Sequence, residues 1–200
     1  MFHQSVDLAA RFSAVVLRDE GGEVLDQWDT RGLSAFQFAA KIARTSLDSE
    51  CEYTVCEDVP HGVKSLFMTK PVMRLQGAIM MASWKTIDRL YFMQPATWMA
   101  QFPGVQRVPK EIAKGMTKTQ SDKWRIDKAA EHARALGYEA PDLLAQWIAD
   151  NPDVKPLKKN TGDLDKSRSD YVSAWLMSEF LQAYHLQDLP TITGVQIANI

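Results

Sequence analysis

Short apolar runs separated by polar turns dominate the first third of the chain, and this pattern is typical of β-strands. We predict one first strand over residues 6–7 and 12–17, with an irregular start near Ala9. A Gly-Gly pair at 21–22 indicates a hairpin turn, after which residues 24–28 alternate as the returning strand. The chain is therefore expected to begin with an antiparallel hairpin.

Longer apolar periodicities predict helices between and after the strands. Ser34 is placed to cap a helix whose apolar face continues to Ala43, and Pro71 falls in the first turn of a helix over residues 68–84. Further strands are predicted over residues 53–57 and 89–92, and further helices over residues 95–99, 121–136, 142–149 and 166–184. This order predicts an α/β fold with a mixed central sheet.

Three stretches lack a clear periodicity. Residues 104–120 form a basic, polar segment that we interpret as a loop or as a surface that orders on contact. Residues 151–166 are rich in Lys, Asp, Asn, Pro and Gly, which is typical of a flexible loop. The last ten residues are either an extra edge strand or a docking segment. We expect residues 1–200 to form a single domain.

Composition and cysteine usage narrow the class of protein. Hydrophobic residues make up 46% and charged residues 24% of the chain, as in ordinary soluble domains. The two cysteines, Cys51 and Cys56, lie beside one predicted strand and indicate a reducing compartment. The start MFHQSVDLAA lacks a signal-peptide pattern, and no apolar run approaches the roughly 20 residues that span a bilayer. We therefore expect a cytoplasmic protein with no membrane partner.

Charge is distributed unevenly despite the net charge of −2. Residues 1–58 carry five basic and eleven acidic side chains, whereas residues 101–128 carry seven basic and three acidic ones. Residues 155–168 carry five basic and two acidic ones. This separation suits a protein that holds cations at one point and phosphates around it. Solvated helix faces and loops would also account for the basic segments.

Three acids stand at informative positions. Asp7 lies in the first strand, Glu57 ends the strand at 53–57, and Asp170 lies in the first turn of the last helix. Apolar residues flank each of them, so each is expected near the interior, where carboxylates are costly unless they are paired or bound to metal. If they converge, a hard divalent cation such as Mg²⁺ is the usual reason. Asp58 is expected on the opposite face of its strand.

Each acid also has a purely structural interpretation. Asp7 could accept hydrogen bonds from backbone amides at a turn, and Glu57 could pair with a lysine. Asp170 could simply favour the N-terminal end of its helix. Taken singly, each of these alternatives is stronger than a catalytic role, and all of them stay open at this point.

Five motifs follow one another along the chain. SVDLAARFSAVVL carries Asp7 on a strand followed by a turn and an antiparallel strand, and YTVCEDVP ends a strand at Glu57. The other three are RLQGAIMMA at 74–82, DRLYFMQPATWMAQFPG at 88–104 and DYVSA at 170–174. In this order they resemble the motifs of RuvC-like Holliday junction resolvases of the RNase H-like (retroviral integrase) superfamily, in particular phage-encoded members. The resemblance implies an RNase H-like fold, with helices on both faces of the mixed sheet.

The resemblance also implies an activity, which is Mg²⁺-dependent endonucleolytic resolution of Holliday junctions or other branched DNA. Two Mg²⁺ or Mn²⁺ ions about 4 Å apart would be held by Asp7, Glu57 and Asp170, with Asp7 bridging both. The family's final acid falls on Ser173. Either three acids suffice, with Ser173 on the same helical face as Asp170, or Asp165 or Asp163 reaches in.

Partners follow from the same resemblance. Family members act as homodimers, with much of the interface on the helix over residues 68–84, and Phe67 is a candidate wedge against a base. The candidate DNA-binding cations are Lys110, Lys114, Lys118, Lys158, Lys159, Lys166 and Arg168. A phage-encoded member would act in the host cytoplasm. The alternative functions are a nuclease of this fold acting on forks, flaps or RNA–DNA hybrids, and a non-catalytic DNA-binding module.

Overall fold

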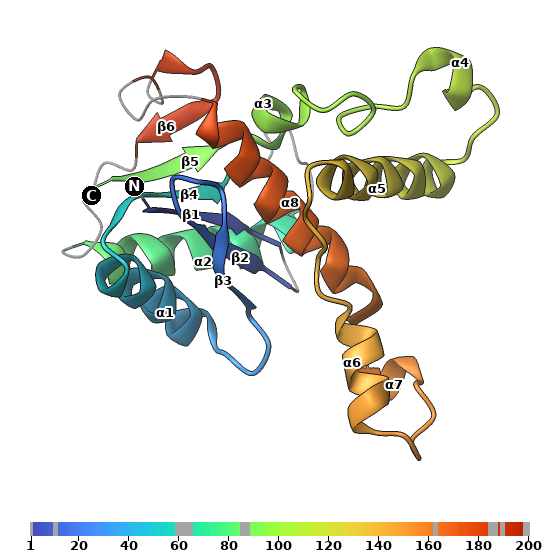
Figure 1. Cartoon of the computed structure of the whole chain (residues 1–200), viewed down its shortest axis with the longest axis horizontal. Helices are drawn as coiled ribbons and strands as arrows, with labels where there is room; N and C mark the ends of the chain where they lie inside the picture. Colours follow the sequence, from blue (N-terminus) through green and yellow to red (C-terminus); the bar gives the residue numbers. More distant parts are fainter. Residues whose placement is uncertain are drawn as a thin grey trace.

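The computed structural model describes residues 2–9, 12–58, 66–84, 89–161, 164–183, 188 and 191–197. Its strands are β1 (Phe2–Asp7), β2 (Ala14–Arg18), β3 (Val24–Asp29), β4 (Cys51–Glu57), β5 (Leu90–Met93) and β6 (Val195–Ile197). Its helices are α1 (Ala35–Asp48), α2 (Leu66–Ser83), α3 (Pro95–Met99), α4 (Lys110–Ala113), α5 (Lys118–Ala135), α6 (Leu143–Asp150), α7 (Lys158–Thr161) and α8 (Leu164–Gln182). Together they form one sheet with helices around it (Figure 1).

The six strands are ordered β3-β2-β1-β4-β5-β6. Strand β1 runs parallel to β4, and β4 runs parallel to β5, whereas β2, β3 and β6 add antiparallel pairs. The predicted mixed sheet is therefore confirmed. Of the two alternatives for the C-terminal segment, the edge strand is correct, because β6 pairs with β5.

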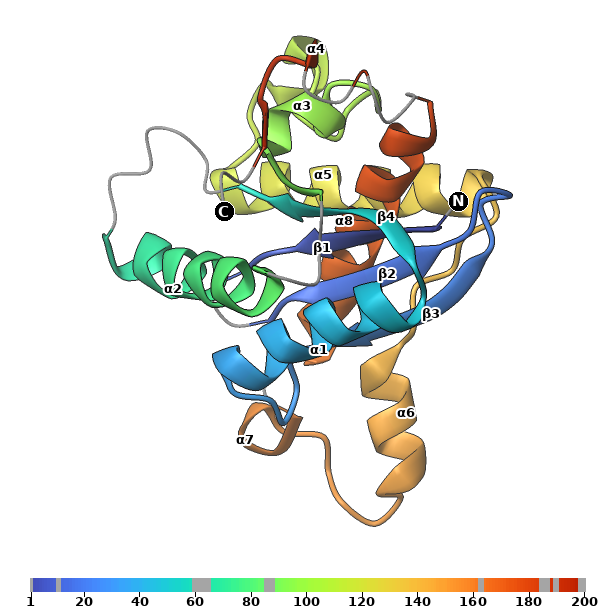
Figure 2. The same cartoon turned by 90° about the vertical axis from the view of Figure 1, so that its left-hand side faces the viewer.

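Helices cover both faces of the sheet, as expected. Helices α1 and α2 pack together on one face, and α8 crosses the other face against β1 and β2 (Figure 2). Helices α3, α5 and α6 contact α8 from its outer side. Each face has its own apolar core, because successive strand residues point to opposite sides. Val6 and Val15 face α1 and α2, whereas Ala14 and Val16 face α8.

Local signals in the sequence fix several element boundaries. Ser34 caps α1 in a capping box with Gln37, and Thr117 and Gln120 form the same arrangement at the start of α5. Gly137 ends α5 with a φ of 90°, in the left-handed region that glycine adopts without strain. Local capping contacts therefore mark both helix starts.

Other boundaries differ from those expected. Residues 6–7 and 12–17 belong to two antiparallel strands, β1 and β2, because the polar turn between them reverses the chain. The segment 104–120 contains α4 and the first turn of α5, and the segment 151–166 contains α7 and the start of α8. Pro71 is the sixth residue of α2 and so lies beyond its first turn.

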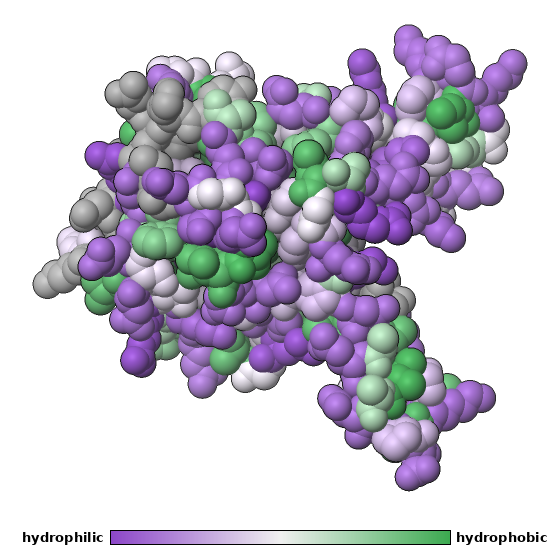
Figure 3. Space-filling view, viewed as in Figure 1, coloured by the Kyte–Doolittle hydropathy of each residue, from purple (hydrophilic) through white to green (hydrophobic). Residues whose placement is uncertain are grey.

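Two projections extend from the body of the molecule. One carries α4 and the beginning of α5, the other carries α6 and α7, and a recess separates them (Figure 3). The first half of α8 lies between their bases, in contact with α5 and α6. Among the described residues, no helix is both long and apolar enough to span a membrane.

Candidate active site

Asp7 and Glu57 lie side by side at the ends of two parallel strands. The register pairs Val6 of β1 with Cys56 of β4, so the next residue on each strand is one of the two acids. Asp7 is buried, with 7% of its surface exposed, and its side chain is hydrogen-bonded to Glu57. Two carboxyl groups in contact at the carboxyl edge of a sheet form the centre of the site.

Helix α8 brings the third acid to this point. Asp170 interacts electrostatically with both Asp7 and Glu57, so the structure brings together the three acids expected from the sequence. Asp170 lies in the second turn of α8 rather than the first, because the helix already begins at Leu164. The Ser173 hydroxyl donates a hydrogen bond to Asp7, and the Ser169 hydroxyl donates one to Asp170.

Burial and mutual repulsion make these acids difficult to ionise. Burial is the main cause, and the neighbouring carboxylates add to it, so the pKa of Glu57 rises to about 7 and that of Asp170 to about 8. The pKa of Asp7 is raised well above its usual value, first by burial and then by Glu57. Without a counter-charge, the site therefore retains protons near neutral pH.

The donor set suits a hard divalent cation, because carboxylate and hydroxyl oxygens are the ligands that Mg²⁺ and Mn²⁺ prefer. Bringing negative charge together in a buried place is costly unless a cation neutralises it. Within the described residues, however, no three His, Cys, Asp or Glu side chains are already arranged to hold one ion. A cation would have to draw the three carboxylates closer than they lie here.

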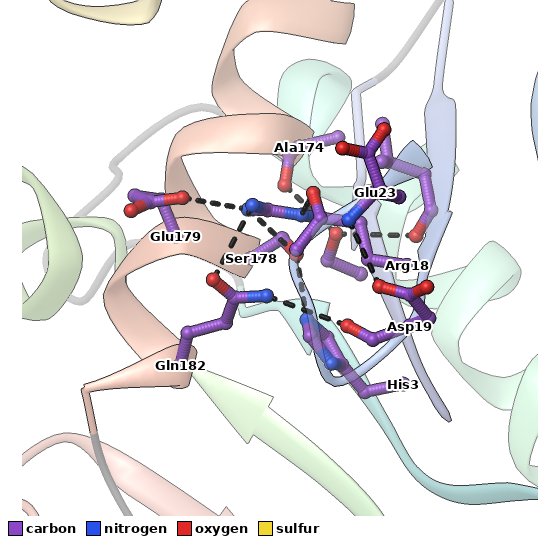
Figure 4. Close-up of polar contacts among 11 residues, drawn as sticks. His3, Arg18, Asp19, Glu23, Ala174, Ser178, Glu179 and Gln182 are labelled. Atoms are coloured by element: carbon purple, nitrogen blue, oxygen red, sulfur yellow. Dashed lines mark hydrogen bonds and ion pairs between the residues drawn. The ribbon is translucent and has the colours of Figure 1, made fainter. Parts of the chain in front are cut away.

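A line of polar contacts connects β1 to α8 behind the acids. Alternate residues of β1 face the helix, so Ser5 Oγ donates to the Ala174 carbonyl at 2.8 Å and Asp7 accepts from Ser173. At the other end, His3 Nε2 lies 2.6 Å from Ser178 Oγ (Figure 4). These three contacts, which we call the polar seam, fix the position of α8 along the strand that carries Asp7.

Arg18 of β2 strengthens the seam at its far end (Figure 4). Its side chain is almost fully buried, and Nη1 forms a 2.8 Å ion pair with Glu179. Nε donates to the Gly22 carbonyl at 2.9 Å, and the guanidinium lies 4.8 Å from the centroid of the Trp175 ring. Burial and the charge of Arg18 lower the pKa of His3 to about 4, so His3 is neutral in the folded protein at neutral pH.

Two further contacts hold the active-site end of the molecule. The Tyr171 hydroxyl donates to Asp29 Oδ2 at 2.7 Å and attaches the first half of α8 to β3. Asp58, the residue after Glu57, accepts hydrogen bonds from the side chains of Gln76 at 3.1 Å and Gln94 at 2.5 Å. It is half-buried and ties the end of β4 to α2 and to the segment before α3.

The candidate DNA-binding residues are spread over several elements. Lys110 is in α4, Lys114 follows that helix in an extended conformation and Lys118 begins α5, so the three lysines do not lie on one helix in this structure. Lys158 and Lys159 are exposed on α7. Arg168 lies on α8, with Nη2 at 3.7 Å from Glu139. The side chains of Phe67, Asp163, Asp165 and Lys166 lie outside the described residues.

Sequence reasoning did not single out the supporting residues. Polar residues at every second position of a strand that is otherwise buried were a usable signal for His3 and Ser5. Arg125 of α5, which lines the same cavity as Ser169 and Ser173, gave no such signal, because it is one of many basic residues in its segment. Its place at this cavity depends on how α5 packs on α8.

No protein-family model and no curated protein matches the chain. Among solved structures, Thermus thermophilus RuvC is similar over 98% of this chain and 99% of its own, with a TM-score of 0.55 and 13% identity. T. thermophilus RuvC in complex with Holliday junction substrate is similar over 68% of this chain and 96% of its own, with a TM-score of 0.42 and 11% identity. Fowlpox virus resolvase in a complex with Holliday junction DNA is similar over 69% of this chain and 100% of its own, with a TM-score of 0.34 and 13% identity. The first likeness shows that this chain has the RuvC fold, which confirms the RNase H-like fold expected from the sequence.

Proposed function

We propose that this chain, which has the RuvC fold, is a divalent-cation-dependent endonuclease that resolves Holliday junctions and related branched DNA. The observation that carries the proposal is the meeting of Asp7, Glu57 and Asp170, from β1, β4 and α8, at one edge of the sheet. These are the three acids that the resemblance to resolvases assigns to catalysis. The proposal therefore joins a fold, a sequence pattern and a local arrangement of charge.

Asp7, Glu57 and Asp170 would hold two Mg²⁺ or Mn²⁺ ions, with Asp7 as the shared ligand that the resemblance implies, since its side chain contacts Glu57 directly and it also interacts with Asp170. When bound, such ions activate a water molecule for attack on phosphorus and stabilise the leaving 3′ oxygen. The buried site keeps the carboxylates out of bulk water. Their attraction to a cation is stronger in this environment than in water, because the dielectric constant is lower. Ser173 keeps Asp7 oriented through its hydrogen bond, in the place of the family's final acid.

Basic side chains around the site would fix the DNA backbone by charge, without reading sequence. Lys110, Lys114 and Lys118 lie on the projection that carries α4, and Lys158 and Lys159 lie on the one that carries α7 (Figure 3). The recess between the projections has the first half of α8 at its base. Duplex arms entering this recess would pass between the two groups of lysines and reach Asp170.

A homodimer would supply two matching active sites for a two-fold symmetric junction. Helix α2 is the proposed interface, and the apolar side chains of Met73 and Met81 in this helix and of Trp84 directly after it are exposed. Their spacing of eight and three residues puts them on one side of the helix. Sedimentation of the wild type and of Met81→Glu tests this proposal, and a wild type that stays monomeric at micromolar concentration would contradict it.

Cleavage of a synthetic four-way junction with and without Mg²⁺ tests the proposed function. Linear duplex, a flap and an RNA–DNA hybrid of the same sequence are the control substrates. Symmetric nicks in the junction that require the cation support the proposal. Equal cutting of flaps and junctions would leave a nuclease but not a resolvase, and binding without any cutting would indicate a non-catalytic DNA-binding module.

A further inference from the structure

A cavity of about 230 Å³ lies between α3, α5 and α8. Ser169, Val172 and Ser173 form its wall on α8. The hydroxyls of the two serines contact Asp170 and Asp7, so the cavity is one side chain away from the proposed cation ligands. Whatever occupies this space would lie close to the bond that is cut.

The rest of the wall is apolar, with charged groups at one edge. Its apolar residues are Trp98, Met99, Val105, Ile126 and Ala129. The charged pair is Asp122 and Arg125, with Nη1 of Arg125 at 3.8 Å from Asp122 Oδ1. Arg125 is held in place because its Nε donates to the Val105 carbonyl at 2.8 Å. The cavity therefore combines apolar surfaces with a fixed donor group and a nearby acceptor.

We propose that this cavity holds one unstacked nucleobase of the strand that is cut. The proposal rests on the proposed function, since it specifies how the same site takes its substrate. The volume is below the roughly 300–1,000 Å³ of sites for drug-sized ligands and suits a single heterocyclic base. Apolar walls contact the faces of the base, and Arg125 and Asp122 hydrogen-bond to its edge, as in other pockets for extruded bases.

The location of the cavity favours a base over a free small molecule. A nucleotide whose phosphate lies at the proposed cation site has its base attached only a few bonds away. Extruding a base costs least where it is already unpaired or poorly stacked, which is the condition at a branch point. Occupation of the cavity would therefore favour branched DNA over linear duplex, in addition to the contacts made by charge.

Junctions carrying a single abasic site at each position around the cut test the proposal. We expect one position next to the cut phosphate at which removing the base slows cleavage at least about fivefold. Ala129→Met fills the cavity and should slow cleavage of the intact junction to a similar extent, with no further loss on that abasic junction. Ala130→Met is the matched control, because Ala130 faces the neighbouring groove between α5 and α8 rather than this cavity.

Arg125→Gln gives a second test that leaves the cavity open. It should slow cleavage of the intact junction and weaken the dependence of cleavage on the base. Lys123→Gln is the matched control, because it removes the same charge from the same helix away from the cavity. If no abasic position slows cleavage, or if Ala129→Met and Arg125→Gln keep the wild-type dependence on the base, the inference is wrong. Cleavage of the intact junction by the wild type would still support the proposed function.

Binding without catalysis gives an independent measurement. A junction carrying 2-aminopurine at the sensitive position, or at each position next to the cut if no cleavage is seen, is titrated without divalent cations. We expect a change in its fluorescence with the wild type and with Ala130→Met, but not with Ala129→Met at the same occupancy. Binding with no fluorescence change at any position would contradict the base-binding cavity alone, and failure to bind branched DNA would contradict both proposals.

Discussion

The two faces of β1 are built from alternate residues of one short strand, yet they pack in different ways. Val6 and Leu8 enter the apolar core under α1 and α2. On the opposite face, His3, Ser5 and Asp7 meet α8 through the polar seam. The face covered by α1 and α2 also contains polar contacts, because the Thr54 hydroxyl lies 3.4 Å from both the Gln4 side chain and the Ser46 hydroxyl.

The two faces of β1 therefore contribute differently: the apolar face mainly stabilises the fold, and the polar face also sets the position of α8. Apolar burial is non-directional, so it holds α1 and α2 without specifying their place along the strand very closely. Hydrogen bonds are directional, and α8 carries Asp170 and Ser173, which must lie within a fraction of an ångström of a productive arrangement. The face with the acids therefore combines an apolar core with a line of polar contacts that sets the position of the helix.

Substituting the acid at the centre of the polar face should have the largest effect. Asp7→Asn is expected to lower junction cleavage at least about a hundredfold, comparable to losing one main electrostatic contact in other enzymes. The metal-free protein should at the same time unfold at a higher temperature at pH 8, because a neutral side chain replaces an acid whose pKa is raised by burial and by Glu57. Cleavage rates and thermal unfolding check the two halves, and a less stable, fully active variant would contradict both.

Removing apolar side-chain volume from the opposite face should lower stability and leave cleavage nearly unchanged. Ile42 of α1 is fully buried in the core that α1 and α2 share with the sheet. Ile42→Ala is expected to lower the free energy of unfolding by about 3 kcal/mol, with cleavage by the folded protein within about twofold of the wild type. Urea denaturation and cleavage at low temperature measure the two quantities. A large loss of activity would show that the two faces are coupled more strongly than proposed.

The pH dependence of stability should also separate the faces. Because the pKa values of Glu57 and Asp170 are raised to about 7 and about 8, the folded protein binds more protons than the unfolded chain. The stabilisation is present at low pH and is lost as the pH rises through these values. His3 opposes this trend only slightly above pH 6.5, because it is neutral in the folded protein and the unfolded chain has lost most of this proton by about one pH unit above its usual pKa.

Between pH 6.5 and 9, the metal-free protein should therefore lose on the order of 2 kcal/mol of stability, at about 1.4 kcal/mol per unit of pKa shift. Asp170→Asn should reduce this loss, and Ile42→Ala should leave it unchanged. Urea denaturation at several pH values without divalent cations checks the prediction. A stability that rises with pH over this range would contradict the raised pKa values.

The smallest effect on stability is expected in the middle of the polar seam. Ser5→Ala removes the hydrogen bond to the Ala174 carbonyl and should cost about 1 kcal/mol. If the seam positions α8, cleavage should fall severalfold, with a higher Mg²⁺ concentration needed for half-maximal rate, because Ser173 and Asp170 are displaced. Ser46→Ala is the matched control for loss of a buried hydroxyl on the other face. Equal cleavage rates for Ser5→Ala and Ser46→Ala would show that the polar seam contributes to stability but does not position the catalytic residues of α8.

The sequence predicted well what depends on local pattern. The alternation of apolar residues predicted most of the strands, and Ser34 marked the start of α1. Asp7 and Glu57 could be predicted to meet, since adjacent parallel strands end at one edge of the sheet. The role of Asp170 needed the resemblance as well, because nothing local states which face of the sheet a late helix covers.

Features that depend on packing could not be predicted in this way. Lys110, Lys114 and Lys118 have a helical spacing, but α4 ends at Ala113 and the chain turns at Lys114 and Gly115, which has a φ of 88°, before α5 begins at Lys118. The burial of Arg18 depends mainly on its contacts with α8, among them Glu179 and Trp175, which lie more than 150 positions away in the chain. The cavity beside Ser169 requires α3, α5 and α8 to come together, and no single segment encodes it.

A crystal structure of the protein soaked in Mn²⁺ tests the central claim most directly, because anomalous scattering locates the ion without reference to activity. The account predicts Mn²⁺ between β1, β4 and α8, ligated by Asp7 together with Glu57 or Asp170, and no ion at this place in Asp7→Asn. Well-ordered carboxylates with no Mn²⁺ between them, at a concentration that occupies other sites, would contradict it.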